Sequence, residues 1–226
     1  MNQKPDSSFF PQLGKNLHQF EFSNGFRSLY HQRPDILYTE SCLVFSINDT
    51  VQSKTQGLAH IVEHLVARYL KEQLASWGER CEITARTDFD TIFFSCSATD
   101  EAFTDVLRVF KGIFELAPHI QADRDSFEDE MKVVLAELKH IDQDIHSLIK
   151  TKGMELLFGN TPYGVGDPAG HIEDVKTVLL EQVSLYFNSI FSPSNGVLAV
   201  TGYHGEPVAF INIVSQHLGF QYCAGC

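Results

Sequence analysis

The chain is short of positive charge. It has 17 Lys and Arg residues against 29 Asp and Glu residues, which gives a formal net charge of −12 over 226 residues. Phosphate backbones and anionic membranes are repelled on average by such a surface. We therefore expect neither nucleic acid nor membrane as a partner.

Long apolar runs are also missing. No apolar stretch approaches the roughly 20 residues that are needed to cross a bilayer. The sequence starts Met-Asn-Gln-Lys-Pro-Asp-Ser-Ser, without the apolar core of a signal peptide, and its early Asp6 is unlike an acid-poor transit sequence. These features predict a soluble, cytoplasmic protein.

Cysteines are few and do not pair by spacing. An odd, scattered set in a chain of this length favours reduced thiols over a disulfide framework. The set comprises Cys42, Cys81, Cys96, Cys223 and Cys226. Cys223-Ala-Gly-Cys226 is a lone Cys-x-x-Cys without a second pair, and we expect it to belong to a frayed carboxy-terminal tail.

Apolar residues make up 43% of the chain, which is enough for one sizeable core. Hydrophobic periodicity predicts a hairpin over 19–30 around Asn24-Gly25, strands at 38–47, 82–87, 91–98 and 196–201, and helices at 57–77, 100–116, 122–150, 177–187 and 206–218. This order is typical of an α+β fold, in which an antiparallel sheet carries helices mainly on one face. We expect a single domain at 19–218, between tails at 1–18 and 219–226.

The segment His60-Ile61-Val62-Glu63-His64 carries the main chemical signal. On a helix, His60 and His64 lie one turn apart, with side chains within roughly 40° of each other, so both imidazoles can bind one metal ion. Glu63 lies beside the pair, where it can act as a base on a water molecule. A catalytic zinc site needs such a base, three protein ligands and one open position.

Spacing alone does not select the third ligand. Glu130 and Glu137 are seven residues apart in the long predicted helix and therefore share a face. Several acids of the same segment compete with them, namely Glu128, Asp129, Asp142 and Asp144. Periodicity leaves the choice open, and a solvated His-Glu-His stripe without metal is the simpler alternative.

Four segments together resemble the inverzincin peptidases of the pitrilysin, insulinase and mitochondrial processing peptidase type. Gly57-Leu-Ala-His-Ile-Val-Glu-His-Leu65 is similar to the active-site helix, and Glu130-Met-Lys-Val-Val-Leu-Ala-Glu137-Leu138 to the segment with the third zinc ligand. The later matches are Pro162-Tyr163-Gly164 with Gly170, and Tyr186 to Gly202. The resemblance covers about residues 19–205 and implies an amino-terminal catalytic domain of such a peptidase.

This resemblance assigns roles to the residues. It implies that His60, His64 and Glu137 bind Zn²⁺, that Glu63 is the general base and that Glu130 is an auxiliary acid that supports the site. The expected function is that of a zinc-dependent endopeptidase, or a subunit of one, which hydrolyses peptides with metal-activated water.

One departure concerns the peptide-binding strand. The family usually has Asn-Ala-x-Thr there, whereas this chain has Thr84-Ala85-Arg86-Thr87. Pairing of the strand with a bound peptide uses main-chain hydrogen bonds, which survive this change. We therefore expect Thr84, Ala85 and Thr87 to contact substrate.

A second departure is length. Members of the family usually carry two such domains in each half, and an Arg and a Tyr of the second domain complete the substrate site. The resemblance therefore implies a second homologous domain, which a partner chain, a longer form of this protein or a homodimer would supply.

Two other functions stay open. A non-catalytic peptide-binding or assembly subunit would also lack the second domain, although it has no chemical need for a complete metal motif. S-ribosylhomocysteine lyase also has His-x-x-Glu-His, with a Cys as third ligand, so Cys81 and Cys96 keep a small-molecule enzyme in consideration.

Overall fold

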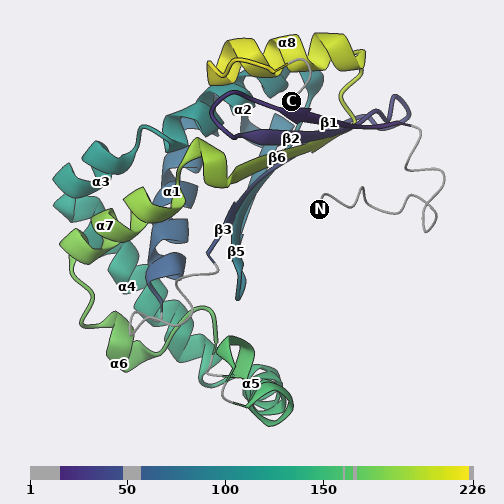
Figure 1. The fold of residues 1–226 in the computed structure, drawn as a ribbon. Helices are drawn as coiled ribbons and strands as arrows, with labels where there is room; N and C mark the ends of the chain where they lie inside the picture. Colours follow the sequence, from purple (N-terminus) through teal and green to yellow (C-terminus); the bar gives the residue numbers. More distant parts are fainter. Residues whose placement is uncertain (1–15, 48–56, 160, 165–166, 224–226) are drawn as a thin grey trace.

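A six-stranded sheet forms the centre of the fold (Figure 1). The computed structural model describes residues 16–47, 57–159, 161–164 and 167–223. The strands are β1 (Leu17–Glu21), β2 (Arg27–His31), β3 (Thr39–Ser46), β4 (Cys81–Thr87), β5 (Thr91–Ala98) and β6 (Gly196–Thr201), in the order β1-β2-β6-β3-β5-β4. Neighbouring strands are antiparallel except β2 and β6, which are parallel.

Helices cover mainly one face of this sheet (Figure 1). They are α1 (Leu58–Leu74), α2 (Asp100–Ile113), α3 (Ala117–Ala122), α4 (Arg124–Ile141), α5 (Ile145–Phe158), α6 (Ile172–Val175), α7 (Leu180–Ile190) and α8 (Pro207–Leu218). Alternate strand residues such as Leu43, Phe45 and Phe94 are buried on the covered face. The predicted α+β architecture is confirmed, and the parallel β2–β6 pair is an addition to it.

Helix α1 is the centre of the helical layer. Its residues Ile61, Val62 and Val66 are fully buried, as expected from their helical spacing. Gly57 precedes the helix with a φ of 93°, a conformation that favours glycine. A Cβ at this position would lie 2.5 Å from the Val175 side chain, so the start of α1 packs closely against α6.

The predicted long helix at 122–150 is wrong in one respect, because it is two helices. Helix α4 ends at Ile141, and α5 begins at Ile145. The Asp144 carboxylate caps α5 by accepting a hydrogen bond from the Ser147 backbone N–H at 2.9 Å. Apolar periodicity continues across the break, so it concealed this capping signal. The helix predicted at 100–116 is also shorter, since α2 ends at Ile113 and Pro118 lies in the first turn of α3.

The carboxy-terminal segment packs against the sheet as far as Cys223, and is not frayed over these residues. The ring of Phe220 lies 5.0 Å from that of Phe26 and 5.5 Å from that of Phe114, measured between centroids. Cys223 also donates a backbone hydrogen bond to the Glu21 carbonyl at 3.1 Å. Cys226 and residues 1–15 of the expected amino-terminal tail lie outside the described residues.

Two further observations concern the described part of the chain. Cys42, Cys81 and Cys96 are not joined in disulfides, as their scattered positions predicted. No helix within the described ranges combines the length and apolar character that a bilayer span requires.

Tyr30 connects β2 to the loop before α8. Its hydroxyl lies 2.7 Å from the Tyr203 carbonyl and 2.6 Å from the Gly205 carbonyl, and its ring stacks on Phe210 at 4.3 Å. Burial raises the pKa of Tyr30 to about 12. The unfolded value is about 10, so the neutral phenol stabilises the fold below pH 10, and this contribution is lost as the pH rises through 12.

We expect Tyr30→Phe to lower the free energy of unfolding by about 1 kcal/mol at pH 7, because the two part-buried carbonyls lose the one hydroxyl donor that they share. The difference from the wild type should shrink above pH 10. Urea unfolding at pH 7 and above pH 10 measures this difference in the free energy of unfolding. Tyr222→Phe, a change at a partly exposed tyrosine, is the control. Equal stability of Tyr30→Phe and the wild type at pH 7 would contradict this role.

Candidate metal centre

The His-Glu-His segment lies in the first half of α1. His60 and Glu63 are buried, with exposed fractions of 6% and 8%, whereas His64 is half-buried. The Nε2 atoms of His60 and His64 are 3.2 Å apart, as expected for imidazoles one turn apart on a helix. The segment is therefore not a solvated stripe.

Helix α4 packs against α1 and brings two glutamates to the histidines. Glu137 Oε2 lies 3.2 Å from His64 Nε2 and 3.7 Å from His60 Nε2. Glu130 Oε2 lies 3.3 Å from the other nitrogen of His64, Nδ1. Packing thus distinguishes these two glutamates from their competitors. Three of those competitors interact elsewhere: Glu128 with Arg124, Asp129 with Lys132 and Asp144 with Ser147.

The donor atoms of His60, His64 and Glu137 fit a zinc ion. All three lie within 4.8 Å of one another. Ligand atoms about 2.0–2.2 Å from a tetrahedral zinc ion are roughly 3.4 Å apart, and the three separations are 3.2, 3.2 and 3.7 Å. Two imidazoles and a carboxylate are also a donor set that zinc accepts, with a fourth position left for water or substrate.

Burial sets the protonation of His60. Desolvation is the main cause that lowers the pKa of His60, and the neighbouring His64 lowers it further. The charge of Glu137 opposes this shift, and so does the backbone of Ala169, although His60 Nδ1 has no hydrogen-bond partner among the described residues. A neutral imidazole keeps the lone pair on Nε2 that a metal ion requires.

Glu63 is buried beside the donor set. Desolvation raises the pKa of Glu63, while a hydrogen bond from Thr87 opposes the shift. The Thr87 hydroxyl donates to Glu63 Oε2 at 2.9 Å. A carboxylate with a raised pKa is a stronger base than one in water, which suits proton transfer near neutral pH.

The three residues predicted to contact substrate lie on β4 but do not share one face. Thr84 is exposed and pairs with Ser95 on the face opposite to α1. Ala85 and Thr87 pair with Phe94 and Ile92 on the covered face. Strand β4 is an edge of the sheet, and among the described strands it pairs only with β5. Its outer edge can therefore receive an extended peptide.

Two residues near the site were not identified in this role from the sequence. Thr87 contacts Glu63 directly, whereas its sequence motif predicted only a contact with substrate. Arg68 lies one turn beyond His64, with Nη1 3.5 Å from Glu130 Oε1 and Nε 2.9 Å from Glu72 Oε1. The i, i+4 spacing indicates that His64 and Arg68 lie on the same face of the helix. It does not indicate that Arg68 contacts Glu130 of α4.

The two cysteines considered as metal ligands lie together on neighbouring strands. The sulfur atoms of Cys81 in β4 and Cys96 in β5 are 2.9 Å apart. Within the described ranges, the only group of three or more possible ligands is His60, His64 and Glu137. The structure therefore favours the glutamate over either cysteine as third ligand.

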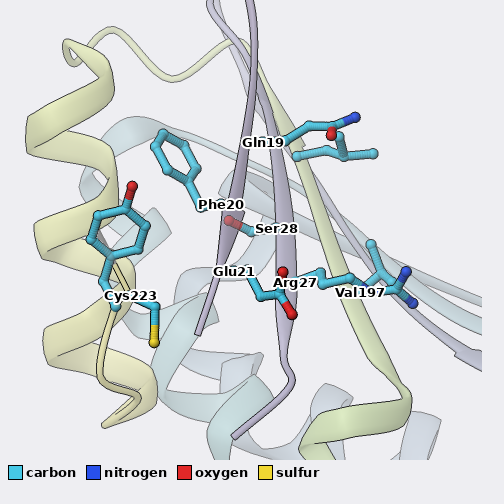
Figure 2. Close-up of a pocket in the computed structure, with 9 residues that line it drawn as sticks. Gln19, Phe20, Glu21, Arg27, Ser28, Val197 and Cys223 are labelled. Atoms are coloured by element: carbon cyan, nitrogen blue, oxygen red, sulfur yellow. The ribbon is translucent and has the colours of Figure 1, made fainter. Parts of the chain in front are cut away.

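A cavity of about 360 Å³ lies elsewhere, at the other edge of the sheet (Figure 2). Figure 2 shows Phe20 and Cys223 on the side of α8, with Gln19, Arg27 and Val197 across strands β1 and β2. None of its lining residues is a predicted site residue. The cavity and the metal centre are thus separate features.

Comparison with known proteins connects this fold and site to peptidases. No protein-family profile matches the chain. The chain is 24% identical to the chloroplastic stromal processing peptidase of Arabidopsis thaliana over 195 residues, which is 82% of this chain and 15% of that protein. The first half of the periplasmic protease PqqL from Escherichia coli has the same fold, with a TM-score of 0.75 and 18% identity over 90% of this chain.

The fold also occurs without activity. The peptidase M16 inactive domain from Pseudomonas fluorescens matches with a TM-score of 0.73 and 15% identity over 90% of this chain, so the fold alone does not establish catalysis. This chain spans about half of that domain, 46% of the PqqL half and about one sixth of the plant relatives. The resemblance to the inverzincin peptidases is nevertheless confirmed, and the chain has the fold of an M16-like peptidase domain.

Proposed function

We propose that the chain is the catalytic domain of a zinc-dependent endopeptidase. One observation carries the proposal: two imidazoles and a carboxylate lie at tetrahedral ligand spacing, with a buried glutamate, Glu63, beside them. The plant relative in sequence is a processing peptidase and the PqqL half belongs to a protease, which supports this class of reaction.

Each residue of the metal centre has its own role in the proposed reaction. His60, His64 and Glu137 hold the zinc, which when bound lowers the pKa of a water molecule to about 7 and polarises a peptide carbonyl. Glu63 takes the proton of the attacking water and delivers it to the leaving amine. Glu130 accepts the Nδ1 hydrogen of His64 and so orients that ring, and Arg68 holds Glu130 in turn.

The substrate is a peptide bound at the edge of the sheet. The outer backbone of β4 pairs with it in an extended conformation, so that affinity comes from main-chain hydrogen bonds. Thr84 and Ala85 contact the bound peptide from the two faces of the strand. Thr87 also acts on Glu63, since its hydroxyl fixes the orientation of that carboxylate.

A second domain completes the site. The residues around the metal are acids and imidazoles, and further hydrogen-bond donors are needed to stabilise the oxyanion of the tetrahedral intermediate. The PqqL half and the Pseudomonas fluorescens domain are each about twice as long as this chain, which supports a two-domain or paired arrangement. A partner chain, a longer form of this protein or a second copy supplies these donors.

A non-catalytic peptide-binding subunit is the alternative, because a domain of this fold exists in an inactive form. The buried base favours the enzyme, since peptide binding alone has no use for a desolvated carboxylate such as Glu63.

Metal removal separates the two functions. With a quenched fluorescent peptide library as substrate, we expect cleavage by zinc-loaded protein, loss of cleavage with 1,10-phenanthroline and recovery when zinc is added back. Heat-treated protein is the control for spontaneous hydrolysis. Peptide binding that persists without cleavage, at full zinc occupancy and with every candidate partner chain, would establish the binding subunit instead.

A further inference from the structure

Two cysteines face each other on the covered side of the sheet. Cys81 is the first residue of β4, and Cys96 lies near the end of β5. The register places Cys81 opposite Ala98, two residues after Cys96, so the two cysteines are diagonal neighbours on one face. Their sulfur atoms are 2.9 Å apart, and both are free thiols. The metal centre uses neither of them, so the pair is a feature of its own.

The two thiols differ in their access to solvent. Cys96 has an exposed fraction of 0%, whereas Cys81 is half-buried. Cys81 also lines a cavity of about 280 Å³ between the end of α1 and the start of β4, together with Lys71 and Glu82. A small reagent that enters this cavity therefore meets Cys81 first, while the protein shields Cys96.

The hydrogen bond between the thiols gives them different reactivity. Once Cys81 ionises, only Cys96 can donate, and this hydrogen bond is the main cause that lowers the pKa of Cys81, while burial opposes the shift. The pKa of Cys96 is raised by the same hydrogen bond and by burial. The thiolate is the reactive form of a cysteine. Cys81 is therefore the nucleophile of the pair, and Cys96 keeps its proton.

We propose that Cys81 and Cys96 form an oxidation site, at which hydrogen peroxide converts the two thiols into one disulfide. The Cys81 thiolate attacks one oxygen of the peroxide, the O–O bond breaks and hydroxide leaves, so that Cys81 becomes a sulfenic acid. The Cys96 sulfur then attacks the Cys81 sulfur, the S–O bond breaks and the S–S bond forms. The Cys96 proton leaves with the departing hydroxide as water. In total, the two thiols lose two electrons and two protons, and one peroxide is reduced to two molecules of water.

Closure of the disulfide requires a small movement of the start of β4. The sulfur atoms have to approach by about 0.9 Å to reach the usual S–S bond length of about 2.05 Å. Diagonal neighbours are usually about 7–8 Å apart, at the upper limit of the Cα separation that a disulfide accepts, so the backbone of Cys81 moves toward β5. This residue begins the strand, directly after the 3-10 segment Ala75–Arg80. Within the described sheet β4 is an edge strand, so no further strand on its outer side opposes the movement.

The link changes the edge strand that carries it. A covalent bond from Cys81 to β5 restricts local opening of β4, which the hydrogen bonds of a single neighbouring strand hold in the reduced protein. Amides of residues 82–87 should therefore exchange more slowly with solvent after oxidation, whereas those of α7 should not change. The same strand is the proposed site of peptide pairing, but the oxidation site itself does not depend on peptidase activity.

Peptide mapping of the oxidised full chain tests the inference. Trypsin cuts between the two cysteines at Arg86, so that Cys81 and Cys96 fall in separate peptides, 81–86 and 87–108. The protein is treated with hydrogen peroxide, its remaining thiols are alkylated, and it is digested without reductant. We expect the two peptides to be linked, with a mass about 2 Da below the sum of the free peptides, and to separate again with dithiothreitol.

Single variants test the order of the two steps. In Cys96→Ser the sulfenic acid of Cys81 should accumulate and be trapped by dimedone, whereas in Cys81→Ser the buried Cys96 should stay reduced. Cys42→Ser is the matched control. Cys42 pairs with Ser95 and so lies on the opposite face of the sheet from Cys96, and burial raises the pKa of its thiol. This variant should form the same disulfide as the wild type.

The wild type alone can overturn the inference. Free, alkylated cysteines in both peptides, under peroxide treatment that oxidises dithiothreitol in a parallel sample, would show that the pair is not an oxidation site. Dimedone on Cys96 in Cys81→Ser, without dimedone on Cys81 in Cys96→Ser, would overturn the assigned roles of the two thiols.

Discussion

Glu63→Gln is expected to lower the rate of peptide hydrolysis by at least about a hundredfold while zinc stays bound, because general base catalysis contributes 10²–10⁴ in rate. Glutamine preserves the size of the side chain and the acceptor for the Thr87 hydroxyl, but it cannot take a proton. The measurement is kcat/KM on the quenched peptide library, with the zinc content of each sample determined in parallel.

A graded variant follows from the hydrogen bond to Thr87. Thr87→Val removes the donor with little change in shape, and we expect about a tenfold loss in kcat with KM unchanged, equivalent to ~1.4 kcal/mol. Thr87→Ser restores the hydroxyl and should restore most of the rate. Full activity of Glu63→Gln at full zinc occupancy would remove Glu63 as the base, whatever the behaviour of Thr87.

Loss of one ligand has the second large effect. Glu137→Ala and His60→Ala should each abolish stoichiometric zinc binding, because each removes one of three protein donors. We expect the zinc Kd to rise by more than the roughly 10–100-fold cost of losing a supporting residue, which is the effect expected for Glu130→Ala. Competition with a chromogenic chelator measures the Kd.

Glu128→Ala is the matched control for Glu137→Ala. Both residues are exposed glutamates of α4, but Glu128 pairs with Arg124 and has no contact with the histidines. Its zinc Kd should equal that of the wild type. Zinc bound at full stoichiometry by both Glu137→Ala and His60→Ala would place the metal elsewhere.

Local sequence patterns predicted the elements that carry the metal centre. The spacing of His60 and His64 on an apolar-periodic segment is a property of one helix, and α1 has the expected geometry. The third ligand depends on how α4 packs against α1, which no local pattern encodes. Spacing therefore left several acidic residues as candidates for the third ligand, and only the packed structure places Glu137 beside both histidines.

The features that were missed arise from tertiary contacts or from competing signals. Thr87 faces α1 because of the register of β4 with β5, and the strand pattern did not show which side chain it would meet. The end of α4 was hidden because apolar residues continue at helical spacing into α5. Two of these residues, Ile145 and Leu148, fit the helical spacing that predicts a buried face, although the structure leaves them exposed.

Anomalous diffraction at the zinc edge, on crystals of the zinc-loaded chain, tests the central claim most directly. The account predicts one zinc ion per chain, bound by Nε2 of His60, Nε2 of His64 and a carboxylate oxygen of Glu137 at about 2.0–2.2 Å. Zinc bound by the sulfur atoms of Cys81 and Cys96 at about 2.3 Å, or no zinc between the two histidines, would contradict it.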